Sequence, residues 1–466
     1  MRQKLWMILL LFTAVVGQVT AQDLGCGSAV SLNGASIEVA SVSGDDTDNI
    51  QCALDAAVSD GYRVVSLVSP AYEIGAVEVT GFVGDLVGKS IANTRLEIQD
   101  DSLTCDSEVP GSALRFNVGN AAVKQMTIAV GSPCGNGATA NVISFYSNPA
   151  DCSKRTGFGV VDRVDITGSG SAGQDIVTGV VMDAAPGCSA ANQKLLGTLK
   201  LNRSTLRDLD FGVLTSLAGG AQVDINYNTF EKVGLPISMV DAYQSTTILG
   251  NTINYNDAAS GYQSSSGLGT TGIFIASTAA SPSDNGTTIK ANKFVDGGDS
   301  DQGYALLSGQ YDKEIAHAVV VSGNTFTGNT ANVNGAGMAF IDTKNGLVSG
   351  NTFRNYATSW LSLSKGNQSQ GFAGVTVSGW AVAANDFANS SAVLDIALGA
   401  GTTGNVVAKG QDLPVVEDAT GTNDVLESSV SANQFGGKPI SVGASEMLDR
   451  QFLTIQNSDS MRALAK

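Results

Sequence analysis

The 466-residue sequence contains a single histidine, His317, and its six cysteines form no Cys-x-x-Cys pair. The usual zinc-site patterns of closely spaced cysteine and histidine are therefore absent. Only 15% of the residues are charged, and their balance gives a net charge of −17. Because no basic patch stands out from this acidic background, nucleic acid is not an expected partner. After the N-terminal segment, no apolar stretch is long enough to predict a membrane span.

The first residues have the layout of a secretory signal peptide. Arg2 and Lys4 precede an apolar stretch from Leu5 to Val16, and the small residues Val19-Thr20-Ala21 precede Gln22. This order of a basic start, a short apolar centre and a small-residue cleavage site is typical of export signals. The sequence therefore predicts a signal peptide over residues 1–21 and a secreted protein, extracellular or periplasmic.

The cysteines all lie in the first half of the chain. They are Cys26, Cys52, Cys105, Cys134, Cys152 and Cys188. An even number of cysteines in an exported chain favours disulfides over metal ligation. Pairing in chain order is the simplest connectivity, and it gives Cys26–Cys52, Cys105–Cys134 and Cys152–Cys188. We expect these bonds to staple the N-terminal part of the protein.

One signature recurs through the second half of the chain. A short apolar run is followed by Ala, Gly or Tyr, then Asn, then one residue, then Phe or Ile. It occurs at Val223–Phe230, Thr246–Ile253, Thr287–Phe294, Val319–Phe326, Gly346–Phe353, Trp380–Phe387 and Ser428–Phe435. Strand-forming residues that repeat without a helical period indicate a β-solenoid with one coil per repeat. The asparagines are predicted to stack in successive coils as a hydrogen-bonded amide ladder.

A second set of strands is predicted beside the signature strands, and each opens after a polar turn. These strands are Gly179–Asp183, Gly212–Ser216, Pro236–Asp241, Gly272–Ser277, Gly337–Asp342, Ser359–Ser364 and Ala392–Ala397. Between Tyr72 and Lys200 the strands are clear but the repeat is degenerate. The regular coils therefore begin near Leu201.

One convincing helix precedes the strands, between residues 45 and 57. Thr47 or Asp48 can cap its N-terminus, Ile50, Leu54 and Ala57 fall on one face, and a glycine at 61 ends it. Since the open end of a solenoid must be covered, this helix is the expected N-terminal cap. The predicted organisation is an N-terminal cap over 22–70, a parallel β-helix over 71–440, and a C-terminal cap or tail over 441–466.

The Gly44–Ala57 segment reads GDDT followed by an IQxALDAA-type helix. This resembles the N-terminal cap of the pectate-lyase-like superfamily, and the Asn-x-Phe coils are similar to its repeats. The resemblance spans nearly all of the chain after the signal peptide. It implies an all-β fold, a right-handed parallel β-helix (β-solenoid) with an N-terminal capping helix.

The superfamily includes polysaccharide lyases, polygalacturonase-like hydrolases, epimerases, phage tailspikes and adhesins, so the resemblance implies a scaffold rather than one chemistry. The Gly-His-Gly motif of polygalacturonases and the YG-x-DPH-type motif of alginate epimerases are both absent. A polysaccharide lyase or a glycoside hydrolase is the expected kind of enzyme, if the protein is an enzyme. The alternative is a non-enzymatic surface, adhesion or structural protein.

Three aspartates end strands of the second set: Asp183, Asp241 and Asp342. Because coils stack about 4.8 Å apart, equivalent positions form columns. With one coil between Asp183 and Asp241, their backbones are predicted to lie roughly 9–10 Å apart. Two carboxylates about 6.5–9.5 Å apart suit an inverting glycosidase. These three residues are the candidate catalytic groups, and turn-forming aspartates are the alternative interpretation.

Cations and a calcium site are weaker candidates. A lyase needs a base and a group that neutralises a uronate, and the available cations are Lys154, Arg155, Arg163, Lys344 and Lys365. None lies in a recognisable motif. The run from Asp296 through Asp299 to Asp301 offers oxygen ligands to Ca²⁺ without the spacing of a known calcium loop. No other cofactor is expected.

Tyrosines cluster near the predicted loop insertions. Tyr255, Tyr262, Tyr304 and Tyr311 are the candidate substrate-binding residues, because aromatic faces can pack on the apolar faces of sugar rings. Insertions between coils are predicted at Asn254–Thr271, Ala276–Gly286, Asp296–Gly303 and Ser364–Ala373. A ligand groove is therefore expected beside the second set of strands, with polysaccharide as the partner.

Overall fold

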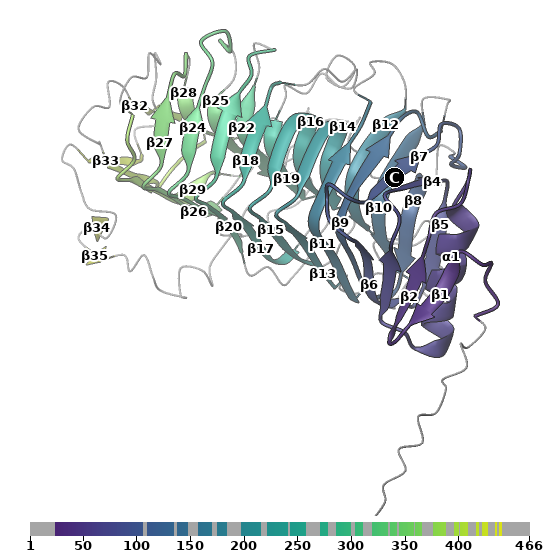
Figure 1. Ribbon diagram of the computed structural model, residues 1–466. Coiled ribbons are helices and arrows are strands. Elements are labelled where there is room, and N and C mark those ends of the chain that lie inside the picture. Colours follow the sequence, from purple (N-terminus) through teal and green to yellow (C-terminus); the bar gives the residue numbers. More distant parts are fainter. Residues whose placement is uncertain are drawn as a thin grey trace, which may run out of the picture.

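The computed structural model describes residues 24–105, 110–134, 138–147, 157–169, 175–183, 197–215, 221–240, 243–257, 271–277, 286–299, 303–310, 319–333, 336–342, 344–357, 359–365, 376–387, 396–399, 401–408, 416–418, 422–426, 434–435 and 438–439. Within this part of the chain, α1 (Thr47–Asp60) is the single helix, and 33 strands belong to one continuous sheet. The sheet winds into a long coil with α1 at one end (Figure 1). The fold is a parallel β-helix, as the sequence predicts.

The strands stack in three strips, named here faces 1, 2 and 3 in the order in which the chain passes through them. Face 1 contains β2 (Ser36–Val39), β3 (Val64–Leu67), β6 (Val83–Gly88), the first halves of β9 (Gly119–Val130) and β11 (Gly157–Thr167), β13 (Thr198–Asn202), β15 (Ala221–Asn226), β17 (Tyr243–Leu249), β20 (Thr287–Lys290), β23 (Val319–Ser322), β26 (Lys344–Ser349), β29 (Ser378–Ala383), β31 (Val406–Ala408) and β33 (Asp424–Leu426). Within each strip neighbouring strands run parallel, and β1 (Val30–Asn33) adds an antiparallel edge to β2.

Faces 2 and 3 continue each coil. Face 2 contains β4 (Ala71–Ile74), β7 (Arg95–Ile98), the second halves of β9 and β11, the first halves of β14 (Thr205–Thr215) and β16 (Thr229–Val240), β18 (Thr252–Tyr255), β21 (Lys293–Asp296), β24 (Thr325–Thr327) and β27 (Thr352–Arg354). Face 3 contains β5 (Val77–Thr80), β8 (Gly111–Asn117), β10 (Thr139–Tyr146), β12 (Ile176–Asp183), the second halves of β14 and β16, β19 (Thr271–Ser277), β22 (Tyr304–Gln310), β25 (Ala336–Ile341), β28 (Ser359–Ser364), β30 (Ile396–Leu398) and β32 (Val416–Asp418). A separate antiparallel pair joins β34 (Gln434–Phe435) to β35 (Lys438–Pro439). The second set of strands expected from the sequence is face 3.

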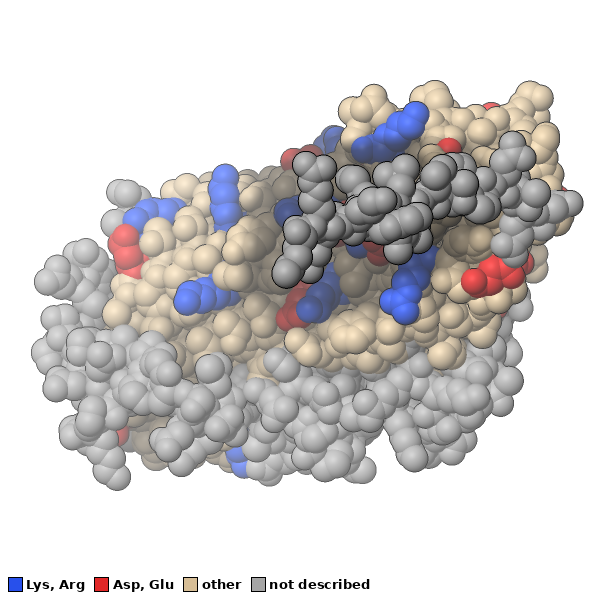
Figure 2. Space-filling model, turned by 60° about the horizontal axis from the view of Figure 1, so that its bottom comes forward, with Lys and Arg blue, Asp and Glu red and all other residues tan. Residues whose placement is uncertain are grey.

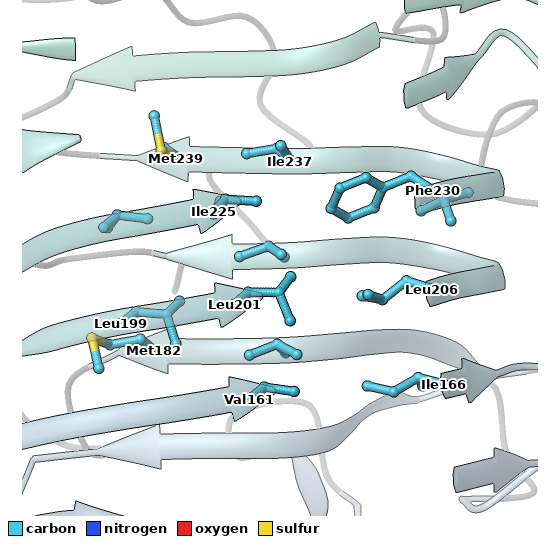
Figure 3. Close-up of a cluster of buried hydrophobic side chains, with 14 of the residues drawn as sticks. Val161, Ile166, Met182, Leu199, Leu201, Leu206, Ile225, Phe230, Ile237 and Met239 are labelled. Atoms are coloured by element: carbon cyan, nitrogen blue, oxygen red, sulfur yellow. The ribbon is translucent and has the colours of Figure 1, made fainter. Parts of the chain in front are cut away.

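The core lies inside the coil and is built by strand alternation. Val161, Leu201 and Ile225 are register partners on three successive strands of face 1, and all three are buried. They point toward the inward side chains of faces 2 and 3, such as Phe230 and Ile237 (Figure 3). Because successive strand residues point to opposite sides, the residues between them face outward. Inward stacking therefore fixes which polar side chains reach the surface.

The predicted asparagine ladder is confirmed at the turn from face 1 to face 2. Six buried asparagines stack in consecutive coils: Asn228, Asn251, Asn292, Asn324, Asn351 and Asn385. The Asn324 amide donates to the carbonyl of Ile289 (2.9 Å) and to Asn351 Oδ1 (2.9 Å). Its own Oδ1 accepts from the backbone and side-chain nitrogens of Asn292, at 2.8 and 3.0 Å. The ladder thus satisfies buried turn groups that no strand pairing reaches.

A phenylalanine stack accompanies the ladder. The rings of Phe294, Phe326 and Phe353 lie parallel, with 4.6 Å between successive centroids. These residues are the Phe of the repeated Asn-x-Phe signature. The signature therefore encodes one polar and one aromatic column.

The helix α1 begins slightly differently from the prediction. Its N-cap residue is Asp46 rather than Thr47 or Asp48, and the Asp46 side chain makes no capping hydrogen bond. The Asp46 carboxylate accepts from the backbone of Val42 (2.7 Å) and Glu73 (3.3 Å) instead. Gly61 ends the helix in the left-handed conformation, as predicted. The predicted apolar side of α1 packs into the main core beside β2, β3 and β5.

Two of the predicted disulfides are confirmed. Cys26 is bonded to Cys52, and Cys105 is bonded to Cys134. Cys152 and Cys188 lie outside the described residues, so their pairing stays a prediction. None of the described segments forms a helix that is both long and apolar enough to cross a bilayer.

Candidate functional site: a polar cluster on face 3

A compact group of polar side chains occupies the outward side of face 3 near its N-terminal end. It is called the Arg115 cluster here and consists of Glu78, Arg115, Asn117, Asn141, Tyr146 and Asp183. These residues come from four adjacent parallel strands, β5, β8, β10 and β12. The register places Asn117, Tyr146 and Asp183 in one column and Glu78 and Arg115 in another.

Strand alternation explains why these side chains point out. Leu114 and Phe116 of β8 enter the core, so Arg115 between them faces the opposite side. In β10 the buried Phe145 places Tyr146 outward in the same way. Parallel stacking about 4.8 Å apart then brings the outward groups of neighbouring coils into contact.

The contacts within the cluster are specific. The Arg115 guanidinium carbon lies 4.6 Å from the centre of the Tyr146 ring, a cation–π geometry. Arg115 Nε donates to Asn117 Oδ1 (3.3 Å), and Asn117 Nδ2 donates to Glu78 Oε1 (2.6 Å). The Glu78 carboxylate also lies 3.8 Å from Arg115 Nε. Arg115 is therefore held in one orientation by a ring and by an amide.

The tyrosine hydroxyl is oriented by a second amide. Asn141 Nδ2 donates to Tyr146 Oη at 3.0 Å, which leaves the phenolic hydrogen for another acceptor. Burial raises the pKa of Tyr146 well above its ordinary value, and the Asp183 charge adds to the increase, while the Arg115 charge opposes it. Tyr146 therefore stays protonated at physiological pH, and its hydroxyl can donate a hydrogen bond.

The cluster is sheltered but not sealed. The Tyr146 residue is 3% exposed and the Arg115 side chain 14% exposed, while Asp183 is partly exposed. Two buried hydroxyls, of Ser144 and Thr178, have no hydrogen-bond partner among the described residues. Ser144 pairs with Arg115 in register, and Thr178 pairs with Asn141. Buried hydroxyls without a partner call for an explanation, and a bound polar ligand is one such explanation.

The chemistry available follows from these groups. A fixed guanidinium can pair with a carboxylate or stabilise the negative charge that develops on an oxyanion. The Tyr146 phenol can donate a proton, and the Asp183 carboxylate can accept one. Among the described residues, no group of three or more His, Cys, Asp or Glu side chains could hold a metal ion. These groups can form hydrogen bonds with hydroxyl or carboxylate groups of a ligand.

The predicted aspartate column does not hold between Asp183 and Asp342. Asp183 belongs to the Arg115 cluster, but Asp342 does not. Asp183 follows Met182 by one residue, and the column of Met182 passes through Thr215, Met239, Ile275, Ser308 and Phe340. Asp342 follows Phe340 by two residues, and it is buried with a positive φ of 55°.

This shift and the number of coils separate the two carboxylates. Five strand spacings lie between β12 and β25, which corresponds to about 24 Å. Asp183 and Asp342 therefore do not belong to one site, because the span is far beyond the roughly 6.5–9.5 Å between the carboxylates of inverting glycosidases. Asp241 lies outside the described residues, and its role stays a prediction.

The four tyrosines predicted to bind substrate also differ in where they lie. Tyr255 is 0% exposed, and its hydroxyl lies 3.0 Å from that of Tyr356, so its predicted sugar contact is wrong. It follows Ile253 by two residues in β18, and both side chains enter the core. Tyr304 begins β22 and packs beside Phe274 and Leu307 while remaining partly exposed. Tyr262 and Tyr311 lie outside the described residues.

The calcium candidate has a structural role. Asp296 is buried, and its carboxylate accepts hydrogen bonds from Asn256 Nδ2 (2.8 Å), Gly298 N (2.9 Å) and Asn332 Nδ2 (2.8 Å). These donors occupy the oxygens that the prediction assigned to Ca²⁺. Burial raises the pKa of Asp296, and the amide donors oppose that increase. Asp301 lies outside the described residues.

Of the predicted cations, the structure describes Arg163, Lys344 and Lys365, and these three do not assemble into one site. Arg163 Nε donates to Asp162 Oδ2 at 3.1 Å, on face 1. Lys344 opens β26 of the same face, and the Lys365 side chain packs over Gly401. Lys154 and Arg155 lie outside the described residues. Arg115, the cation of the candidate site, belongs to none of the repeats that made the other residues conspicuous.

The comparisons with known proteins concern the fold. No protein-family model matches the sequence, and no curated protein matches it. Among solved structures, the A-module of the Azotobacter vinelandii mannuronan C-5 epimerase AlgE4 is similar, with a TM-score of 0.52 and 14% identity over 86% of this chain and 96% of that chain.

Weaker similarity extends to two further proteins. These are the Streptococcus pneumoniae surface adhesin PfbA (TM-score 0.40, 13% identity, 77% of this chain and 91% of that chain) and the tailspike of the E. coli bacteriophage HK620 in complex with a pentasaccharide (TM-score 0.40, 12% identity, 82% and 75%). The epimerase module confirms the parallel β-helix fold. At these identities the similarity shows no shared activity.

Proposed function

We propose that this chain is an exported parallel β-helix protein that binds extracellular polysaccharide at the Arg115 cluster. The observation that carries the proposal is the sheltered assembly of Arg115, Tyr146 and Asp183 on three adjacent coils. A planar cation, a phenol, amides and a carboxylate together match the hydroxyl and carboxylate groups of sugar chains. The epimerase that shares the fold acts, by its name, on mannuronan, which belongs to the same substrate class.

Export is part of the proposal. The basic, apolar and small-residue order of residues 1–21 supports a signal peptide. The bonds Cys26–Cys52 and Cys105–Cys134 fit an oxidising compartment. We assign α1 the role of N-terminal cap, because it covers core residues beside β2 and β5 at the end of the stack (Figure 1).

Catalysis by the same cluster is the next step of the proposal. The Asp183 carboxylate can accept a proton, the Tyr146 hydroxyl can donate a hydrogen bond, and Arg115 can pair with a uronate carboxylate. This arrangement favours lyase-type chemistry on an acidic sugar over hydrolysis by a distant aspartate pair. A binding protein without catalysis is the second candidate, and the long structural ladder favours it.

The test is to measure binding and turnover with purified protein. The parent, Arg115→Met and the control Arg95→Met are compared on neutral and uronic polysaccharides by affinity electrophoresis, reducing-end assays and absorbance of unsaturated uronates. Arg95 also lies beside a carboxylate, that of Glu97 at 2.6 Å, but on the exposed side of face 2. Loss of a charged hydrogen bond is worth about 1.5–3 kcal/mol, which predicts roughly 10- to 100-fold weaker binding for Arg115→Met.

The outcomes separate the candidates. Weaker binding in Arg115→Met, with Arg95→Met and the melting temperature unchanged, supports the site. Products formed by the parent alone identify an enzyme, and binding without products identifies a binding protein. Equal binding by all three proteins sinks the proposal.

A further inference from the structure

A second surface feature lies at the turn from face 1 to face 2, away from the Arg115 cluster on face 3. The residue before each ladder position adopts a left-handed conformation. Successive coils place Arg203 (φ 49°), Tyr227 (φ 60°), Gly250 (φ 67°) and Ala291 (φ 54°) there. This conformation is unfavourable for a bulky side chain, and glycine adopts it readily. Tyr227 is the aromatic residue among these four, and the left-handed turn is shared by the whole column.

The Tyr227 side chain is exposed as well as strained. It is 61% exposed, more than any other large hydrophobic residue among those described. Its burial therefore contributes little that could offset the backbone strain. An exposed aromatic side chain on a turn of fixed backbone can contact a ligand.

The neighbouring coil fixes the orientation of the ring. A Cβ atom at Gly250 would lie 2.6 Å from both Cδ1 and Cε1 of Tyr227, so the ring rests where this glycine has no side chain. The backbone is fixed too, since Tyr227 N donates to the carbonyl of Leu249 (2.8 Å) and Gly250 N donates to that of Lys290 (3.0 Å). The aromatic ring is thus held against the coil surface and open to solvent.

Cations flank this ring in an otherwise acidic protein. On one side, Arg203 donates to Asp162 Oδ1 from Nε (3.0 Å) and Nη2 (2.6 Å), and Arg163 donates to the other oxygen of the same carboxylate. Two guanidinium groups therefore share one carboxylate at this turn. On the other side, Lys290 is exposed and lies two coils beyond Asn226, the residue that precedes Tyr227. Figure 2 shows lysine and arginine side chains distributed along this side of the molecule, with acidic side chains among them.

We propose that Tyr227 is the stacking platform of a surface subsite for anionic polysaccharide, with Arg203 and Lys290 flanking the bound sugar. The apolar face of a pyranose ring can pack on the exposed aromatic ring, and its carboxylate or sulfate can meet the flanking cations. The column follows the long axis of the coil stack, so an extended chain can contact several turns. The subsite stands on residues separate from the Arg115 cluster, and either site can fail alone.

The test uses affinity electrophoresis of the full mature protein in gels that contain polygalacturonate, with dextran as the neutral polymer. Tyr227→Ala, Tyr227→Phe and Lys290→Met are compared in the parent and in the Arg115→Met background, so that the two sites are separated. Aromatic packing worth about 0.5–1.5 kcal/mol predicts roughly 2- to 10-fold weaker retardation for Tyr227→Ala. Tyr227→Phe keeps the ring and should bind as the parent does.

The proposal is supported if Tyr227→Ala weakens binding by the same factor in both backgrounds and Tyr227→Phe binds as its parent does. Lys290→Met should also bind more weakly than its parent, and this difference should shrink when salt is added. Equal retardation of Tyr227→Ala and its parent overturns the platform. Equal retardation by dextran overturns the assignment of an anionic ligand. If Arg115→Met binds normally while Tyr227→Ala does not, the function proposed for the Arg115 cluster falls and this subsite stands.

Discussion

The coils from β15 to β29 repeat one buried turn, whereas the coils from β5 to β12 vary from one to the next. In the regular region each turn adds an asparagine to the ladder, and every ladder amide bonds to the coils beside it. In the irregular region the outward column contains Asn117, Tyr146 and Asp183, three different side chains. The first arrangement satisfies backbone groups, and the second leaves a cation and hydroxyls directed outward.

This difference shows where function can be sought in a solenoid. A residue type repeated in every coil serves the contact between coils, because each coil has the same buried groups to satisfy. A polar residue that occurs once, on an outward column, has no such structural reason. Substitutions of the repeated residues should therefore lower the stability of the fold, whereas substitutions in the Arg115 cluster should lower ligand affinity.

The largest expected effect is on the buried tyrosine pair of the regular region. Tyr255→Ala removes a fully buried ring and the hydroxyl that bonds to Tyr356 at 3.0 Å. Large-to-small substitutions of aromatic residues in a core cost about 3–5 kcal/mol. We expect a loss of that size in the free energy of unfolding, measured by urea denaturation. Tyr227→Ala is the matched control, and an equal loss in both variants would contradict the assignment of Tyr255 to the core.

The next effect concerns a single rung of the ladder. Asn324→Ala removes the acceptor for both nitrogens of Asn292 and the donor to Ile289 and Asn351. Leaving buried groups unsatisfied costs about 1–3 kcal/mol each, so we expect a loss of roughly 3 kcal/mol. The control is Asn93→Ala, an exposed asparagine that bonds only locally to Ser90. If the two variants melt alike, the ladder does not stabilise the coils.

A smaller effect depends on pH. Burial raises the pKa of Tyr255 and of Tyr356 above the ordinary value of 10.0. The folded protein therefore keeps protons that the unfolded chain releases above about pH 10, and stability falls as the pH rises past that value. Each such tyrosine contributes a slope of about 1.4 kcal/mol per pH unit. Urea denaturation between about pH 9 and pH 11 should show that the free energy of unfolding falls less steeply with pH in Tyr255→Phe than in the parent. Identical slopes in the two proteins would be inconsistent with a raised pKa of Tyr255.

Much of the fold can be predicted from the sequence because the same buried turn, with the same residue types, recurs in many coils. The Asn-x-Phe signature predicts the ladder and the aromatic stack, and the acidic start and terminal glycine predict α1. Tyr255 shows where this reasoning went wrong. Its segment, Thr252–Tyr255, alternates in the pattern of a strand and places Ile253 and Tyr255 on the same side. The alternation identifies a core tyrosine, although its place beside an insertion suggested a loop.

The Arg115 cluster could not be predicted in the same way. Alternation in β8 places Arg115 opposite Leu114 and Phe116, so its outward direction is readable from the sequence. Which residues lie beside it depends on the register between coils of different length, and the degenerate repeat gives no marker for that register. The aspartate column fails for the same reason, since a shift of one residue separates Asp342 from the column of Asp183.

The proposed division between scaffold and site is that the repeated ladder residues hold the coils together, whereas the Arg115 cluster, built from residues that occur once, binds the ligand. Its most direct test measures melting temperature and polysaccharide affinity together for Arg115→Met and Asn324→Ala. The account predicts that Arg115→Met loses affinity and keeps its melting temperature, whereas Asn324→Ala melts earlier and, below that temperature, binds as the parent does. If Asn324→Ala loses affinity while still folded, or Arg115→Met keeps it, the division between scaffold and site is wrong.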